Sequence, residues 1–184
     1  MRDVLGEVRQ NGYVVPDLQE GVRFWTEVMG VGPFFLLDHI SMPGFTYRGE
    51  AANPVISVAF SHHGNLQIEL IQPHDDEPSM FRDFLRSGQR GLHHVACWTN
   101  DYDRDKAAML AGGFEVGHAS ELKTGENDLV SARFCYVENK AIPGMIVEIL
   151  ERTPLGDLMQ HGIEEAARNW DGAGPIIRPV ASLF

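Results

Sequence analysis

The sequence predicts an α+β protein in which two βαβββ modules form one curved, eight-stranded mixed sheet with helices outside. Two observations predict this fold. The order strand–helix–strand–strand–strand occurs twice, in repeats 8–72 and 90–152, and each repeat closes with an apolar strand around a central glutamate, Glu69 and Glu148. Alternating apolar residues indicate the strands, and apolar residues three or four positions apart indicate the helices.

The first repeat opens with a strand at 8–15 and continues into a helix. Asp17 is a suitable N-cap for this helix, which is predicted to reach about Met29 because apolar residues recur at helical spacing up to that point. Residues 41–53 contain prolines and glycines, so they are predicted as a loop or an irregular strand. The other strands of this repeat are predicted at 34–38, 55–62 and 65–72.

A polar linker, residues 72–90, joins the repeats and contains a short predicted helix at about 79–86. In the second repeat, Asp101 or Asp103 caps a helix that Gly112 terminates. A polar loop at 123–128 separates two of the strands. The strands of this repeat are predicted at 92–99, 114–122, 132–137 and 145–150.

The sequence divides into a domain of residues 1–152 and a C-terminal helix and extended tail, 153–184. The tail is predicted to form an amphipathic helix at 155–168, followed by an extended segment rich in proline and glycine. Trp170 is an isolated large aromatic residue in this segment. We therefore expect the tail to pack on the body of the chain or on a partner chain.

Composition and charge exclude some partners. The net charge of −11 and the lack of clustered basic residues argue against nucleic-acid binding, which needs Lys and Arg to neutralise phosphates. No apolar run has the length of a membrane span or of a signal peptide. Cys97 and Cys135 lie in apolar strand-like runs, which is typical of free thiols in a reducing compartment. We expect a cytoplasmic protein whose partner is a small-molecule substrate.

Four polar side chains occupy strand positions from which they can converge: Gln10, Glu69, His94 and Glu148. Side chains alternate between the faces of a strand, so the concave face of one curved sheet can collect all four if a pseudo-twofold relates the repeats. Burying an unpaired carboxylate is costly. One imidazole, two carboxylates and one amide oxygen suit a divalent ion with open coordination positions. The sequence therefore predicts a metal site.

Each of these residues also has a structural interpretation. The glutamates can be solvent-facing strand residues, His94 can be a hydrogen-bonded core histidine, and Gln10 can be an ordinary polar strand residue. His93 is expected to point away from His94 and to be structural. Two residues near the loop of the first repeat, His39 and Glu50, could reach the pocket mouth. The remaining histidines are predicted in turns, linkers or exposed ends: His62, His63, His74, His118 and His161.

Five segments in order resemble the vicinal oxygen chelate superfamily, which includes glyoxalase I, methylmalonyl-CoA epimerase and the extradiol dioxygenases. The resemblance covers roughly residues 8–152, and the segments are 10–18, 24–30, 67–71, 90–96 and 146–150. It implies that Gln10, Glu69, His94 and Glu148 are metal ligands. It also implies a homodimer, and it favours zinc over nickel, cobalt, manganese and iron.

The ligand set is similar to that of animal glyoxalase I, whereas the segment Gly-Leu-His-His-Val-Ala at 91–96 is closer to the epimerases. The resemblance implies an isomerase, epimerase or lyase that moves a proton next to a carbonyl through an enolate or enediolate. Glu148 is the candidate base, with Glu69 or Gln10 near the opposite face. Two alternatives stay open: a ring-cleaving non-haem iron dioxygenase and a non-catalytic, resistance-type binding protein.

Large apolar residues in the first repeat suggest a substrate with an apolar or acyl-thioester portion, although they can equally be core residues. They are Phe34, Phe35, Met42, Phe45, Tyr47 and Phe60.

Overall fold

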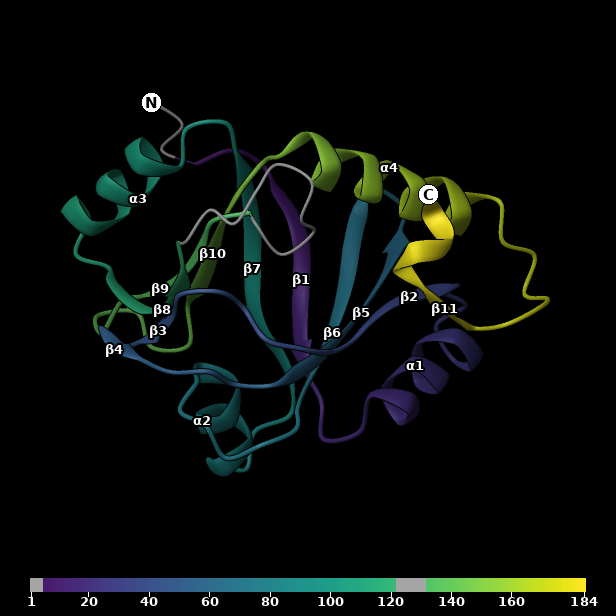
Figure 1. Ribbon diagram of the computed structural model, residues 1–184, viewed down its shortest axis with the longest axis horizontal. Coiled ribbons are helices and arrows are strands. Elements are labelled where there is room, and N and C mark those ends of the chain that lie inside the picture. The colour runs from purple at the N-terminus through teal and green to yellow at the C-terminus, as the bar shows by residue number, and fades with distance from the viewer. Residues whose placement is uncertain (1–4, 122–131) are drawn as a thin grey trace.

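The computed structural model describes residues 5–121 and 132–184, which form a curved mixed sheet with helices around it (Figure 1). The strands of the first half are β1 (Val8–Val14), β2 (Phe34–Ile40), β3 (Phe45–Tyr47), β4 (Glu50–Ala51), β5 (Ile56–His63) and β6 (Leu66–Pro73). The later strands are β7 (Gly91–Thr99), β8 (Glu115–Ser120), β9 (Phe134–Glu138), β10 (Ile146–Glu151) and β11 (Ile177–Pro179). The helices are α1 (Leu18–Glu27), α2 (Met80–Arg86), α3 (Tyr102–Ala111), α4 (Pro154–Arg168) and the short 3-10 helix η1 (Val180–Leu183).

The sheet order is β11-β2-β5-β6-β1-β7-β10-β9-β8-β3-β4. The four strands of the first repeat, β2-β5-β6-β1, thus stand in mirror order to those of the second, β7-β10-β9-β8. The repeats meet where β1 pairs antiparallel with β7, and Figure 1 shows these two strands at the centre. The predicted α+β fold, with two βαβββ modules sharing one curved sheet, is confirmed.

Three short strands add to the eight expected ones, so that the sheet of the described residues has eleven. Residues 41–53 contain β3 and β4, and β3 pairs antiparallel with β8 of the other repeat. In the tail, β11 pairs parallel with β2. All eight predicted strands are present, and strands of two or three residues at the ends of a sheet show no alternation in sequence, which explains why these three were not predicted. The polar loop at 123–128 lies outside the described residues.

Helices α1 and α3 cover the face of the sheet that is remote from the glutamates. Asp17 caps α1 by accepting a hydrogen bond of 2.9 Å from the backbone of Glu20, and Val22 packs with Ile68 and Leu70 of β6. These two β6 residues flank Glu69. Because side chains alternate along a strand, the packing of α1 directs the Glu69 side chain to the opposite, concave face.

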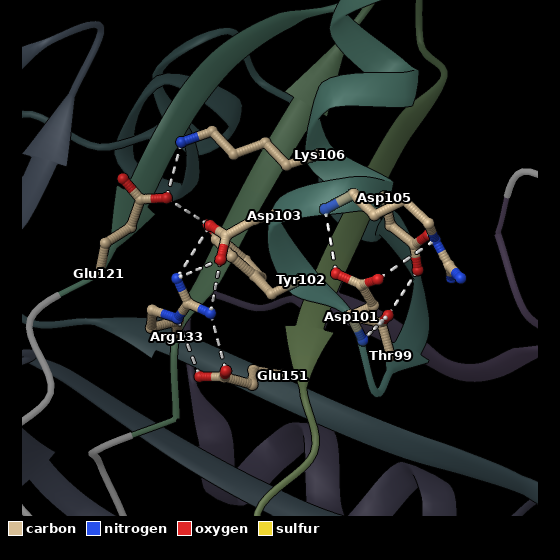
Figure 2. A network of polar contacts seen from close by, with 10 residues as sticks. Thr99, Asp101, Tyr102, Asp103, Asp105, Lys106, Glu121, Arg133 and Glu151 are labelled. Atoms are coloured by element: carbon tan, nitrogen blue, oxygen red, sulfur yellow. Dashed lines mark hydrogen bonds and ion pairs between the residues drawn. The ribbon is translucent and has the colours of Figure 1, made fainter.

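A polar network fixes α3 to the strands of the second repeat (Figure 2). Asp101 caps the helix, as expected. Arg133 lies between Asp103 of α3 and Glu151 at the end of β10, with N–O distances of 3.0 and 2.8 Å, and its guanidinium stacks 4.5 Å over the centre of the Tyr102 ring. The contacts hold the end of β10, three residues after Glu148, in a defined position.

The tail packs on the body of its own chain. Thr153 caps α4, and Met159 and Ile163 of this helix are buried in the apolar cluster on the concave face. Figure 1 shows α4 lying across the strands, with the C-terminal η1 beside it. Trp170 lies so close to Gly32 that a Cβ atom there would be 2.7 Å from its ring. Of the helices that the structure describes, none has the length and apolar character needed to cross a membrane.

Candidate metal centre

The four residues predicted from the sequence converge on the concave face, one from each of the central strands β1, β6, β7 and β10. The Nε2 atom of His94 lies 3.3 Å from an oxygen of Glu69 and 3.3 Å from an oxygen of Glu148. Gln10 lines the same cavity as the two glutamates. All four are buried, with at most 7% of each residue exposed. The solvent-facing interpretation of the glutamates is therefore wrong.

Strand register explains how these residues meet. Gly12 of β1 is the partner of Glu69 on one side and of His94 on the other. A Cβ atom at Gly12 would lie 1.8 Å from Cε1 of His94 and 2.3 Å from its Nε2. The missing side chain thus provides the space in which the imidazole lies between the two carboxylates.

The donor atoms of this cluster fit a divalent cation. One ligand atom each from Glu69, His94 and Glu148 lie within 4.8 Å of one another. Four buried atoms of the cluster have no hydrogen-bond partner among the described residues: Gln10 Oε1, Glu69 Oε2, His94 Nε2 and Glu148 Oε2. Buried polar groups without partners are rare and demand an explanation. A nitrogen and three oxygens of this kind are suitable ligands for zinc and similar ions.

The electrostatics of the cluster favour positive charge at its centre. Burial alone would lower the pKa of His94, but the carboxylates of Glu148 and Glu69, 3.3 Å from its Nε2, outweigh it and raise this pKa to about 9. Burial, with the nearby Glu148 charge, raises the pKa of Glu69 in spite of its contact with His94. The two carboxylates therefore stabilise a cation between them, either the imidazolium or a metal ion.

Two neighbours of the site were missed in the sequence. Tyr136 of β9 is the register partner of Glu148, and the centres of its ring and the His94 ring are 4.6 Å apart. Burial and the charges of Glu148 and Glu69 raise the pKa of Tyr136 well above its usual range, so its hydroxyl keeps its proton. Gln67 lies beside Gln10. The alternation of β6 could have indicated Gln67, which is two residues before Glu69 and shares its face, whereas only the pairing of β9 with β10 reveals Tyr136.

Three expectations about histidines were wrong. His93 does not point away from His94, because the Nδ1 atoms of the two rings are 3.1 Å apart. The pairing of β1 with β7 shifts register here, from Gly12–His94 to Tyr13–Leu92, so His93 is an extra residue that breaks the alternation. His62 and His118 are buried strand residues. Two residues were expected at the pocket mouth, His39 and Glu50. Both are exposed and do not line the cavity.

The cluster lies in a cavity of about 140 Å³ with largely apolar walls. Of the apolar residues singled out in the sequence, Met42 and Phe60 line it, whereas Phe34, Phe35 and Phe45 are core residues. The α4 helix closes one side with Met159 and Gln160. Other apolar lining residues come from β2, β5 and the strands of the second repeat: Leu37, Val58, Phe134 and Leu150.

Solved structures with a similar fold have low sequence identity. A hypothetical protein, BH1468 from Bacillus halodurans C-125, is 17% identical with a TM-score of 0.56, over 80% of this chain and 94% of that one. A variant of the Streptomyces coelicolor methylmalonyl-CoA epimerase in complex with 2-nitronate-propionyl-CoA is 20% identical with a TM-score of 0.55, over 82% and 96%. The epimerase from Mycobacterium tuberculosis is 17% identical with a TM-score of 0.54, over 84% and 93%.

No curated protein sequence matches the chain. The family model described as Glyoxalase/Bleomycin resistance protein/Dioxygenase superfamily matches residues 9–136. This match covers more than half of the chain, and the curved sheet of two βαβββ modules agrees with it. The chain belongs to the glyoxalase, bleomycin resistance protein and dioxygenase superfamily, whose fold is that of the vicinal oxygen chelate proteins.

Proposed function

We propose that the protein is a metal-dependent isomerase, epimerase or lyase that moves a proton at a carbon atom next to a carbonyl. The observation that carries this proposal is the position of Glu69, His94 and Glu148. Their unpartnered donor atoms face one another in a cavity that is otherwise mostly apolar. A carbon acid bound there meets a base and a cation-binding position together.

Gln10, Glu69, His94 and Glu148 would hold a divalent ion, and zinc is the ion that we expect. Such an ion supplies Lewis acidity, which polarises a carbonyl and stabilises the negative charge that develops as the neighbouring carbon loses its proton. The walls of the cavity exclude water from the substrate. Exclusion of water strengthens each electrostatic interaction inside the site.

Glu148 is the proposed base, and Glu69 is the proposed acid or base on the other side of His94. A carboxylate has two oxygens, so one can face the cation while the other reaches the substrate proton. The Oε2 atom of Glu148 has no hydrogen-bond partner within the described chain, and the residue lines the cavity. Tyr136, the register partner of Glu148 on β9, would donate its hydroxyl hydrogen to this carboxylate and orient it.

The apolar walls support a substrate with an apolar or acyl-thioester portion. The epimerase neighbours, which bind 2-nitronate-propionyl-CoA or methylmalonyl-CoA in their structures, agree with this substrate class. We also propose that the protein forms a homodimer. A non-catalytic binding protein would use the same cavity, so turnover decides between the two functions.

Proton exchange in deuterated water tests the proposed reaction. The purified protein, loaded with zinc, is incubated with methylmalonyl-CoA, with longer acyl thioesters and with the hemithioacetal of methylglyoxal and glutathione. NMR then follows deuterium entering the carbon next to the carbonyl. We expect one class to exchange, and we expect Glu148→Gln to remove the exchange. Glu165→Gln, on the exposed side of α4, is the matched control. Full exchange in Glu148→Gln would refute the assignment of the base.

A further inference from the structure

Three glutamine side chains form a continuous hydrogen-bonded row from α4 to the candidate metal centre. The Nε2 atom of Gln10 donates to Oε1 of Gln67 at 2.6 Å, and Nε2 of Gln67 donates to Oε1 of Gln160. The three residues come from β1, β6 and α4. Gln10 and Gln67 are buried, with 2% and 0% of the residue exposed, whereas Gln160 is half-buried in the cavity wall.

The direction of the row decides which atom of Gln10 faces the metal centre. An amide ligates a cation through its oxygen, because its nitrogen carries two hydrogens and has no free lone pair for a metal. The Oε1 atom of Gln10 can be free only if its Nε2 points away and finds an acceptor. The Oε1 atom of Gln67 is that acceptor, provided that Nε2 of Gln67 points away from Gln10. There it donates a hydrogen bond to Oε1 of Gln160. A reversed Gln67 amide would place two nitrogens against each other in a buried position.

We propose that Gln160 is a positioning residue. Its carbonyl oxygen fixes the direction of the hydrogen bonds in this row of three glutamines, which we call the relay, and so keeps Oε1 of Gln10 directed at the metal. The inference rests on the proposed function, since it assumes that Gln10 is a ligand. It extends the site into the tail. Gln160 lies on α4, which follows the two βαβββ modules that supply the four predicted ligands.

The position of α4 does not depend on the relay. Thr153 caps its first turn, and Met159 and Ile163 bury their side chains on the concave face. Leu183 of η1 packs against the helix at Gly162, where a Cβ atom would be 3.2 Å from it. A substitution at Gln160 therefore changes an amide and leaves the helix in place, which makes the proposal testable.

The test is the affinity for Co²⁺ and the visible absorption spectrum of the Co²⁺ protein, neither of which requires a substrate. Gln160→Met has a similar length but no strong acceptor, so Gln67 loses its fixed orientation. We expect Co²⁺ binding to weaken by about 10- to 100-fold, the range typical of groups that orient metal ligands, and the spectrum to change. Gln160→Glu keeps an acceptor and should retain the spectrum of the unaltered protein. His161→Asn, on the exposed side of α4, should leave both unchanged.

A double-mutant cycle separates the relay from other effects of α4. In a Gln10→Ala background the relay has no ligand to orient, so adding Gln160→Met should change Co²⁺ affinity by less than about twofold. An equal loss in both backgrounds, or unchanged affinity and spectrum in Gln160→Met alone, would overturn the relay and leave the metal site standing. Failure of the unaltered protein to bind Co²⁺ would overturn the metal site itself, and the relay with it.

Discussion

Gly12→Ala should disable the metal centre through a single methyl group. The added Cβ would lie 1.8 Å from Cε1 of His94, about 1.6 Å closer than the 3.4 Å at which ordinary contact begins. The imidazole has no space to retreat into, because it is buried and the Tyr136 ring lies 4.6 Å away, centre to centre. Metal–ligand distances tolerate deviations of only about 0.2 Å. The His94 ligand would therefore be lost or badly displaced.

Gly12→Ala should lower both the metal affinity and the stability of the protein. Metal affinity should fall by at least about 100-fold, beyond the loss expected when an orienting group is removed. Overpacking should lower the free energy of unfolding by about 1–3 kcal/mol, or about 2–4 °C in Tm for each kcal/mol in a protein of this size. Competition with a chromophoric chelator measures the affinity, and thermal unfolding of the metal-free protein measures the stability.

Gly21→Ala is the matched control for this experiment. A Cβ at Gly21, in the middle of α1, would meet its nearest neighbour at 3.4 Å, which is ordinary contact. Metal affinity should not change, and the helix should gain roughly 0.5–1 kcal/mol. If Gly12→Ala bound metal within about threefold of the unaltered protein, the placement of His94 between the carboxylates would be refuted.

Three further substitutions test separate parts of the account. Gly32→Ala would bring a Cβ within 2.7 Å of the Trp170 ring, so we expect the tail to be displaced, with a red shift of tryptophan emission and a stability loss of about 1 kcal/mol; unchanged emission would contradict this packing. Burial lowers the pKa of His118 well below 6.5 in the folded protein. As pH falls below 6.5, the imidazole is therefore protonated in the unfolded chain but not in the folded one, and stability is lost. His118→Phe should reduce that loss by up to about 1.4 kcal/mol per pH unit in denaturant titrations, and equal slopes would argue against a buried neutral imidazole. Tyr136→Phe removes the hydroxyl that we propose to orient Glu148, and a hydrogen bond to a carboxylate is worth about 1.5–3 kcal/mol, so proton exchange should slow by roughly 10- to 100-fold while metal stays bound; unaltered exchange would exclude a role in orienting Glu148.

The repeat and its four polar strand residues could be predicted because both follow from side-chain alternation. A buried strand leaves a period of two in the sequence, and a glutamate at its centre is a conspicuous exception. Because the order of elements is the same in both repeats, the opening and closing strands of the two repeats can lie side by side in one sheet. Gln10, Glu69, His94 and Glu148 were identified on this basis, and the structure brings all four together on the concave face, where Gln10 and the two glutamates line the cavity and His94 lies 3.3 Å from both carboxylates.

The rest depends on contacts that leave no local pattern. The strands β3 and β11 pair with distant strands through their backbones, which any sequence can supply. His93 departs from the alternation because of a register shift that only the pairing of β1 with β7 reveals. Gln160 reaches Gln67 across 93 positions, so its role could not be read from either segment alone.

The metal content of the protein tests the central claim most directly. Elemental mass spectrometry of protein purified without chelator, beside Glu148→Ala prepared in the same way, gives the number of divalent ions per chain. We predict about one ion, which we expect to be zinc, in the unaltered protein and a loss of that ion in the variant. The absence of metal, with no uptake on incubation with zinc, nickel, cobalt, manganese or ferrous iron, would contradict it.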